Sequence, residues 1–452
     1  MEQKRSSFTG KIGFVLAAAG SAVGLGNIWR FPYLAAQYGG GIFLLVYVIL
    51  AITFGFAIMA AEIAIGRKTG LSVVGAYGRL NRKFTFLGYL AAIVPIIIMP
   101  YYAVIGGWVT KYLGAFVSGG AAAAAEDGYF EAFTARSGES VLWFAVFMLL
   151  TYLVVMFGVE KGVEKVSKIL MPILVVLSLG IAVYTVCLPG AGAGVAYYLK
   201  PDFSKFSFKT IVVAMGQLFY SMSLAMGIMV TYGSYMKKDV DIASSVRQIS
   251  FFDTGIAFMA GLMIIPAVFV FSGGSEEALN KGAGLMFITL PKVFAGMPGG
   301  VVIGAVFFLL VLFAALTSAI SLMETVVSIF VDKFHWNRRL TCTMVLAGCL
   351  VMGLPSILGF GPWSGVKLLG LSFLDFFDFI SNSVLMPIVA FLTCIFVGYV
   401  IKPRAIVEEI RLNNSRFREE KAFSVIIRYV APVFTIMILV ASVAEALGFM
   451  KV

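Results

Sequence analysis

The sequence contains little charge for its length. Asp, Glu, Lys and Arg make up 13% of the 452 residues, whereas a soluble chain has roughly a quarter. Hydrophobic residues make up 60%, and no soluble fold has an interior large enough to bury so many apolar side chains. The shortage of charge therefore excludes an ordinary soluble domain and predicts a membrane protein.

Histidine and cysteine are also scarce, with one His and four Cys in the chain. His335 lies among loop charges, so a histidine-based metal site is not expected. The cysteines lie within or at the ends of apolar runs, where a cysteine is usually a small buried hydrophobic residue. The sequence also lacks a Gly-x-Ser-x-Gly elbow and a phosphate-binding loop, and we therefore do not expect an enzyme.

Long apolar runs are abundant, and a helix needs about 20 apolar residues to cross a bilayer. Barrel strands would instead alternate polar and apolar residues, which the run 307–315 does not do. The long runs lie at residues 11–36, 41–66, 87–116, 140–158, 166–188, 209–236, 250–272, 301–332, 340–357, 372–400 and 424–448. They predict an all-α membrane protein with about eleven transmembrane helices in one domain, residues 1–452. Because the first run contains Asn27 and Arg30, we expect it to be a span and not a cleaved signal.

The net charge of +11 is unevenly distributed between the two sides of these spans. The segments on the same side as the N-terminus hold most of the lysines and arginines, which is the positive-inside pattern. This pattern predicts a cytoplasmic N-terminus and an extracytoplasmic C-terminus. The basic charge therefore indicates topology, and no nucleic-acid partner is expected.

The first span contains three glycines, Gly20, Gly24 and Gly26, followed at once by Asn27 and Arg30. Glycine weakens a helix, and irregular backbone at membrane depth occurs only where it is buried or lines a watery cavity. Close helix packing is the alternative explanation, and the glycine spacing lacks the βαβ context of a dinucleotide site. We interpret the segment as a break whose free carbonyls and half-helix ends bind ions or charged substrate groups.

A second break is predicted in the sixth span, where polar Gln217, Ser221 and Ser223 precede the small residues Ala225 and Gly227. A single serine in a membrane helix often bonds only to its own preceding turn. Two interrupted helices in the two halves of a chain, however, are the best sequence indication of a transporter site.

Further polar side chains occur inside apolar spans. Thr317 and Ser318 could supply oxygen ligands to a hard cation, with simple helix packing as an equally good explanation. Arg30, Glu62, Asp253, Asp375 and Asp378 are charged, and such residues usually face a cavity or a partner. Because Asp253 has no partner nearby in sequence, we expect an ion or a proton to compensate it.

The stretches 24–32 (GLGNIWRFP) and 216–235 resemble the neurotransmitter:sodium symporter family, and the resemblance extends over essentially the whole chain, in the shorter bacterial form. It implies a 5+5 inverted repeat with discontinuous helices 1 and 6. The first repeat is expected at 1–200, the second at 201–400, and a cytoplasmic loop and final helix at 401–452. It implies sodium-coupled uptake of an L-amino acid by alternating access across a bacterial plasma membrane.

The resemblance also implies site residues. The first of two sodium sites is expected to use Ala22, Asn27, Ser221 and Asp253. The second is expected to use Gly20, Val23, Ala314, Thr317 and Ser318. The residues expected to contact the substrate are Ala22, Gly24, Gly26, Ile98, Tyr102, Tyr220, Ser221, Ser223, Met226, Ser318 and Leu322. The expected gates are Arg30 with Asp378 on the outside and Arg5 with Asp332, near Ser234 and Tyr235, on the inside. Gly162 and Pro172 match a family element that unwinds to hydrate the second sodium site.

Individual positions narrow the expected substrate and ions. Family members that carry monoamines have an acidic residue at the position of Gly24, so here the substrate should supply its own carboxylate. Asp253 stands where chloride-dependent members have asparagine, which predicts chloride independence and leaves proton counter-movement open. The chain has Ala225-Met226-Gly227 where many members have Gly-x-Gly, and Glu324 where the leucine transporter has glutamine, with no role assigned to it.

Two alternatives to a transporter stay open. A channel would present rings of like residues around an oligomer axis, whereas these polar residues occur singly in different spans. A non-transporting amino-acid sensor would bind substrate but fail to exchange it. The apolar and aromatic pocket residues predict an apolar or aromatic substrate side chain. The expected partners are this small molecule and the lipid bilayer, with no obligatory protein partner.

Overall fold

The computed structural model describes residues 7–273, 284–413 and 417–446. These residues are predominantly helical, and within them the only β contacts are two isolated bridges, Gly40 with Pro201 and Leu368 with Leu371. The predicted all-α class is confirmed. The helices are α1 (Lys11–Ala22), α2 (Phe31–Gln37), α3 (Gly41–Leu50), α4 (Phe56–Thr69), α5 (Val73–Leu80), α6 (Thr85–Val117), α7 (Ala121–Ala124), α8 (Tyr129–Ala135), α9 (Ser137–Met156), α10 (Lys165–Val186), α11 (Gly192–Leu199), α12 (Phe208–Ser221), α13 (Ile228–Ser234), α14 (Ile242–Phe271), α15 (Leu290–Gly296), α16 (Gly300–Phe334), α17 (Arg338–Leu358), α18 (Phe373–Asp378), α19 (Met386–Ile395), α20 (Lys402–Arg411), α21 (Glu420–Val425) and α22 (Ala431–Ala446).

Nine continuous helical segments within the described residues are long and apolar enough to cross a membrane. They are Gly41–Thr69, Arg82–Val117, Ser137–Met156, Val159–Val186, Ile242–Phe271, Gly300–Phe334, Arg338–Leu358, Phe373–Val400 and Glu420–Ala444. The bent pair Lys11–Ala22 and Gly26–Gln37 makes a tenth if it counts as one span. The pair α12 and α13 lies where the sixth span is expected, but its pieces are too short to satisfy the same criterion. The total of eleven spans therefore stays a prediction.

Several of these spans contain one wider, π-helical turn. Such turns connect α3 to α4 (Ala51–Gly55), α18 to α19 (Phe379–Leu385) and α21 to α22 (Ile426–Val430), and others lie at Val159–Glu164, Leu285–Thr289 and Phe396–Val400. Gly162 lies in the turn that precedes α10, and Pro172 lies inside α10. A Cβ at Gly162 would lie 2.1 Å from the Val154 carbonyl oxygen, so close packing explains the glycine here, and the unwinding expected of this element stays a prediction.

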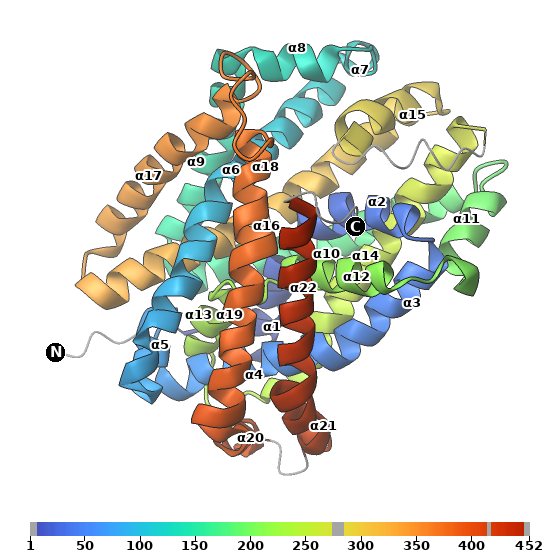
Figure 1. Cartoon of the computed structure of the whole chain (residues 1–452). Helices are drawn as coiled ribbons and strands as arrows, with labels where there is room; N and C mark the ends of the chain where they lie inside the picture. Colours follow the sequence, from blue (N-terminus) through green and yellow to red (C-terminus); the bar gives the residue numbers. More distant parts are fainter. Residues whose placement is uncertain (1–6, 274–283, 414–416, 447–452) are drawn as a thin grey trace.

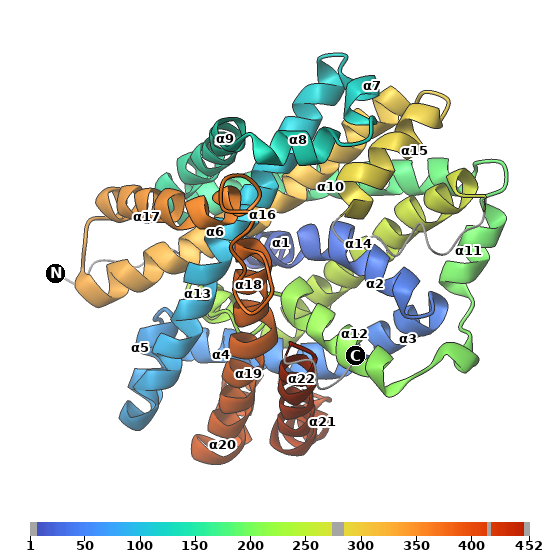
Figure 2. The same cartoon turned by 45° about the horizontal axis from the view of Figure 1, so that its top comes forward.

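The broken helices lie inside the bundle. Helix α1 contacts α10, α14 and α16, while α12 packs on α3 and α13 packs on α4. In Figures 1 and 2, α9 and α17 lie toward one side of the molecule, and α19 and α22 lie side by side on another. The two segments with irregular backbone are thus covered by regular helices, as membrane depth requires.

Candidate functional site

The first break separates α1 from the helical turn that begins at Gly26. Helix α1 ends at Ala22, and Val23 is extended with φ −78° and ψ 99°. The two pieces of the span are bent by 48° relative to each other. The break predicted from the glycines is therefore present, and it leaves backbone carbonyls and the start of a second half-helix in the interior.

The second break lies between α12 and α13. Ser223, Ala225 and Gly227 have φ values of +53°, +59° and +72°. A left-handed conformation costs a non-glycine residue about 1–2 kcal/mol, so tertiary contacts must hold Ser223 and Ala225 in place. One such contact is visible, because the Ala225 N–H donates to Oε1 of the fully buried Glu62 at 2.9 Å.

Hydroxyl groups join the two breaks. The Ser223 hydroxyl donates to the Ser21 carbonyl oxygen at 3.0 Å, and the Ser21 and Ser321 hydroxyl oxygens lie 2.6 Å apart. The Gln217 amide donates to the Gly26 carbonyl oxygen at 2.7 Å. These contacts bring together segments about 200 residues apart in sequence, so the two interrupted helices form one site.

A small cavity lies between the breaks. Ten of the eleven predicted substrate residues line it, namely Ala22, Gly24, Gly26, Ile98, Tyr102, Tyr220, Ser223, Met226, Ser318 and Leu322. Ser221 is the exception, because its hydroxyl donates to Asp253 Oδ1 at 2.7 Å and so lies in a different cluster. Leu25 and Ile228 line the cavity as well, although no polar or glycine signal marks them in the sequence. Ala225, which stands where many family members have glycine, is not among the residues that line this cavity.

Gly24 lets two hydroxyl groups approach the backbone closely at one end of this cavity. A Cβ at this position would lie 2.4 Å from the Ser318 Oγ and 2.9 Å from the Tyr102 hydroxyl, so any other residue would collide with both groups. The Leu25 N–H points to the same Tyr102 hydroxyl at 3.3 Å. Amide and hydroxyl donors at the start of a half-helix favour a negatively charged group.

Asp253 forms a fully buried cluster beside the first break. Its carboxylate accepts hydrogen bonds from Asn27 Nδ2 at 2.8 Å, Ser221 Oγ at 2.7 Å and the Tyr47 hydroxyl at 2.9 Å. All three donors are neutral, and no Lys, Arg or His in the described part of the chain lies within ion-pair distance of Asp253. A buried carboxylate of this kind has excess negative charge that a cation can compensate.

Ser318 forms a second oxygen cluster at the C-terminal end of α1. Its hydroxyl donates to the Ser21 carbonyl oxygen at 2.9 Å and lies 3.4 Å from the carbonyl oxygens of both Gly20 and Val23. The Thr317 hydroxyl lies 3.1 Å from the Ala314 carbonyl oxygen. The structure therefore brings together all five residues predicted for the second sodium site, and every oxygen among them is neutral.

The sequence interpretation missed Tyr47. This residue is fully buried on α3, and its hydroxyl contacts both Asp253 and Ser221. Its hydroxyl is the only polar side-chain group in the run Gly41–Leu50, and that isolation is a signal that could have identified it. Gln217 was recognised as polar but received no role, although it contacts the first break.

The predicted outer gate residues face each other across a second cavity. Arg30 and Asp378 both line a cavity of about 210 Å³, together with Tyr220. They form no ion pair within 4.0 Å in the described structure. Instead Asp378 accepts hydrogen bonds from Asn382 at 2.6 Å and Tyr101 at 3.2 Å, and the Arg30 guanidinium lies 5.4 Å from the Tyr220 ring centroid. The expected Arg30–Asp378 ion pair is thus not made. Tyr220 lines this cavity as well as the cavity between the helix breaks.

The predicted inner gate lies at the opposite end of the broken helices. Arg5 is outside the described residues. Asp332 accepts a hydrogen bond from the Ser72 N–H at 2.7 Å, and the Ser234 hydroxyl donates to the Thr231 carbonyl oxygen at 2.5 Å. The Tyr235 carbonyl oxygen accepts from the Phe8 N–H at 3.1 Å.

Glu324 extends the network at this end. Its side chain is fully buried, accepts a hydrogen bond from the Tyr235 hydroxyl at 2.8 Å and is ion-paired with Arg338 at the start of α17. Arg338 also donates to the Val155 carbonyl oxygen of α9 at 2.8 Å. Glu324 therefore ties α13, α16, α17 and α9 together, a structural role that the sequence did not reveal.

Comparison with known proteins identifies relatives along nearly the whole chain. A model of the sodium:neurotransmitter symporter family matches residues 5–120 and 132–450. An uncharacterized sodium-dependent transporter, YhdH, of Bacillus subtilis is 36% identical, with 97% of each chain covered. The crystal structure of MhsT in complex with L-phenylalanine is similar with a TM-score of 0.88 at 35% identity, covering 97% of this chain and 100% of MhsT. The human sodium- and chloride-dependent taurine transporter is 27% identical, over 83% of this chain and 71% of its own.

Proposed function

The chain belongs to the sodium:neurotransmitter symporter family, and from this premise we propose that it couples sodium entry to the uptake of an L-amino acid with an apolar or aromatic side chain. The observation that carries this proposal is the cavity between the two helix breaks, which Ser318 lines and whose neighbouring residues Asn27 and Ser221 contact Asp253. It offers places for a zwitterion and for cations within one buried site.

The end of the cavity at Gly24 suits the substrate carboxylate. The absence of a Cβ at Gly24 allows the Tyr102 and Ser318 hydroxyls to lie close to the backbone, and the half-helix that follows directs its positive end there. No acidic side chain lines this cavity that could hold the amino group of a monoamine. A similar structure, MhsT, contains L-phenylalanine, which is consistent with an amino-acid substrate.

The other end of the cavity suits an apolar side chain. Ile98, Met226 and Leu322 line it together with the Tyr220 ring. The space open to the centre of a water molecule is only about 20 Å³, so side chains must move for an amino acid to enter. Met226 is the most adaptable of these groups because its thioether chain has several rotatable bonds.

Sodium binding and substrate binding depend on each other in this proposal. A first sodium ion held by Ala22, Asn27, Ser221 and Asp253 completes its shell with the substrate carboxylate, and opposite charges attract strongly in a low dielectric. A second ion is held by Gly20, Val23, Ala314, Thr317 and Ser318. The carboxylate of Asp253 supplies a fixed negative charge to the first sodium site, so this site does not need chloride. The taurine transporter, in contrast, is named as chloride-dependent.

Alternating access follows from the difference between the two ends of the site. The cavity that contains Arg30 and Asp378 lies next to the substrate cavity, while Tyr235, Glu324 and Arg338 are joined at the other end. We propose that pairing of Arg30 with Asp378 closes the first end. The other end would open when Tyr235, Glu324 and Arg338 separate and the expected Arg5–Asp332 gate is released. We expect the N-terminus to lie in the cytoplasm of a bacterial cell.

The test is a thermal-shift screen of the twenty amino acids with purified protein in sodium or potassium buffer, followed by uptake into proteoliposomes. We expect stabilisation by apolar or aromatic L-amino acids in sodium only, and sodium-driven, saturable uptake of the same compounds. Sodium-dependent binding without counterflow would identify a sensor instead. No stabilisation by any amino acid in sodium would contradict the proposal.

A further inference from the structure

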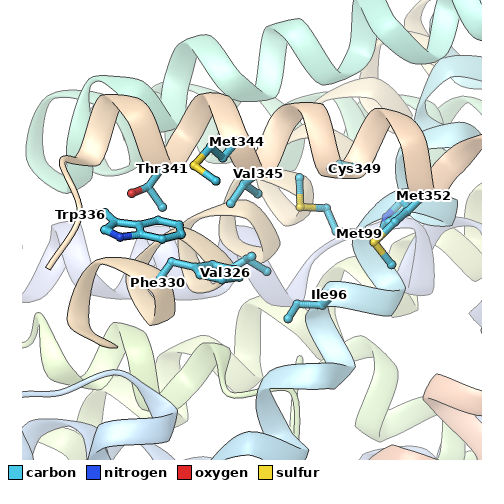
Figure 3. Close-up of a pocket in the computed structure, with 12 residues that line it drawn as sticks. Ile96, Met99, Val326, Phe330, Trp336, Thr341, Met344, Val345, Cys349 and Met352 are labelled. Atoms are coloured by element: carbon cyan, nitrogen blue, oxygen red, sulfur yellow. The ribbon is translucent and has the colours of Figure 1, made fainter. Parts of the chain in front are cut away.

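An apolar groove that is separate from the substrate cavity lies between α6, α16 and α17. It has a volume of about 220 Å³ and is drawn in Figure 3. Its walls include Ile96 and Met99 from α6, Val326 and Phe330 from α16, and Val345 and Met352 from α17. We refer to it as the α17 groove. It shares no lining residue with the cavity between the helix breaks.

The α17 groove has few polar groups, and two of the three are already engaged. The Thr341 hydroxyl donates to the Asn337 carbonyl oxygen of its own helix at 3.0 Å, and the Cys349 thiol lies 3.6 Å from the Met148 sulfur. The third is the indole N–H of Trp336 at one end, so an amino acid or another strongly polar molecule would lose most of its hydration without compensation. The groove fits an apolar chain.

The groove is open to the membrane side of the molecule. Met344 and Met352 on its α17 wall are 47% and 42% exposed, on a helix that is long and apolar enough to cross the bilayer. Flexible methionine side chains adapt to an irregular chain more easily than branched ones. An acyl chain of a membrane lipid can therefore enter sideways without crossing the protein.

One end of the groove carries a cation and aromatic rings. Figure 3 shows Trp336 at this end, beside Phe330, and the two rings are stacked with centroids 6.0 Å apart. Lys333 follows Val326 by two helical turns on the same face of α16, and its Nζ lies 5.5 Å from the Tyr89 ring centroid. Lys333 is exposed and has no carboxylate within 4.0 Å in the described structure. Trp, Tyr and Lys are the residues that typically mark the level of lipid headgroups.

We propose that the α17 groove binds one acyl chain of an anionic phospholipid, with the headgroup phosphate at Lys333. Basic sites between transmembrane helices on the cytoplasmic side are known to bind anionic headgroups. The charge distribution of the sequence places this end in the cytoplasm. Lys333 then selects the headgroup, and the groove supplies the apolar contact.

The test uses Trp336 as a built-in reporter. Lipids with brominated acyl chains quench tryptophan fluorescence on contact, and the difference between the wild type and Trp336→Phe isolates this one of the five tryptophans. Purified protein is titrated with brominated phosphatidylglycerol and with phosphatidylcholine of the same acyl chains, without sodium or amino acid. We expect half-maximal Trp336 quenching at roughly fivefold less phosphatidylglycerol, which corresponds to about 1 kcal/mol for one lysine.

Two pairs of variants distinguish the contribution of the apolar groove from that of the Lys333 charge. Gly348→Leu fills the groove, since a Cβ at Gly348 meets no atom within 4 Å, and we expect it to abolish the saturable quenching. Gly180→Leu on α10 is the matched control, because Gly180 is also exposed and without neighbours within 4 Å. Lys333→Gln should equalise the two lipids, whereas the exposed Lys165→Gln should not.

The outcomes are decisive because the readout is lipid contact and not transport. Equal quenching by both lipids in the wild type would overturn the proposal, as would unchanged quenching in Gly348→Leu. Folding of each variant is checked by its elution profile, and the smaller Gly348→Val replaces a Leu variant that aggregates. A loss of quenching in Gly180→Leu as well would also contradict a specific groove.

Discussion

The two candidate sodium sites are built from different kinds of oxygen. The Asp253 cluster has a buried carboxylate with three neutral donors around it. The Ser318 cluster has only hydroxyl and backbone carbonyl oxygens. Both clusters use the same broken segment of the first span, one through Asn27 and the other through the carbonyl oxygens of residues 20–23. One site therefore has a fixed charge of its own, and the other has only dipoles.

This difference separates two ways of attracting a cation. At the Asp253 cluster the attraction is mainly Coulombic, which makes it sensitive to any change in charge, including the arrival of a substrate carboxylate. At the Ser318 cluster each neutral oxygen contributes a modest free energy to cation binding, so the affinity for the cation depends on the number of oxygens that surround it. We therefore expect the first site to respond to charge removal and the second to respond to the loss of single ligands.

The largest effect is expected for Asp253→Asn. Removing the carboxylate eliminates the Coulombic partner of the cation, a loss of about 3 kcal/mol or roughly a hundredfold in sodium affinity. Without sodium the variant should be as stable as the wild type or more stable, because a buried charge without a cationic partner has been removed. Melting temperatures measured with and without sodium check both parts.

Chloride provides the control for this variant. If Asp253 supplies the negative charge that chloride provides in other family members, adding chloride should restore part of the sodium response in Asp253→Asn and have no effect on the wild type. Strong activation of wild-type uptake by chloride would contradict the role assigned to Asp253, as would full uptake by the variant in chloride-free buffer.

A smaller loss is expected for Ser318→Ala. The Ser318 hydroxyl links α16 to three carbonyl groups of the first break, so its removal eliminates one cation ligand and one inter-helical hydrogen bond. The lost ligand is worth about 1–1.5 kcal/mol, or a five- to twelvefold weaker sodium response, whereas the lost hydrogen bond lowers the stability measured without sodium. Ser328→Ala on the same helix is the control, since Ser328 lies in neither cluster.

The residues that break helices could be predicted from the sequence, whereas their partners could not. Gly24, Gly26 and Gly227 act through local backbone physics, and the structure has a break next to each. Tyr47 acts through contacts with distant residues, Ser221 and Asp253, which lie 174 and 206 residues away in sequence. Such a contact depends on how α3 packs against α14, which the composition of neither helix specifies. Glu324 was equally uninterpretable without its partner Arg338.

The positions of regular spans were also accessible, with most ends within about five residues. The helices predicted at 166–188 and 250–272 begin seven and eight residues earlier, at Val159 and Ile242. The predicted run 301–332 corresponds to Gly300–Phe334, and 340–357 corresponds to Arg338–Leu358. The hydrophobicity of a span does not show which of its residues contact other spans, and it does not show which gate is closed. For this reason the family resemblance, which implied an Arg30–Asp378 pair, did not show that the two residues line one cavity without forming that pair.

Tyr47→Phe should change the sodium response in the opposite direction to Asp253→Asn. The tyrosine hydroxyl stabilises the carboxylate when no cation is bound, and its removal leaves Asp253 with one donor fewer. The sodium-free state should be destabilised by about 1 kcal/mol, and the stabilisation gained on adding sodium should increase accordingly. Melting curves at several sodium concentrations measure the change. A reduced sodium response would show that Tyr47 positions the carboxylate for the ion.

The smallest effect is expected for Thr317→Val, which tests the second cluster one ligand at a time. The Thr317 hydroxyl bonds only within α16, to the carbonyl oxygens of Phe313 at 3.0 Å and Ala314 at 3.1 Å. Valine keeps the volume that packs near Gly20, so the protein should fold normally. Loss of one neutral ligand should weaken the sodium response about threefold, or 0.5–1 kcal/mol. If Thr317→Val instead equalled Asp253→Asn in effect, the two sites would not differ in the way their oxygens suggest, and the second ion would be bound as tightly as the first.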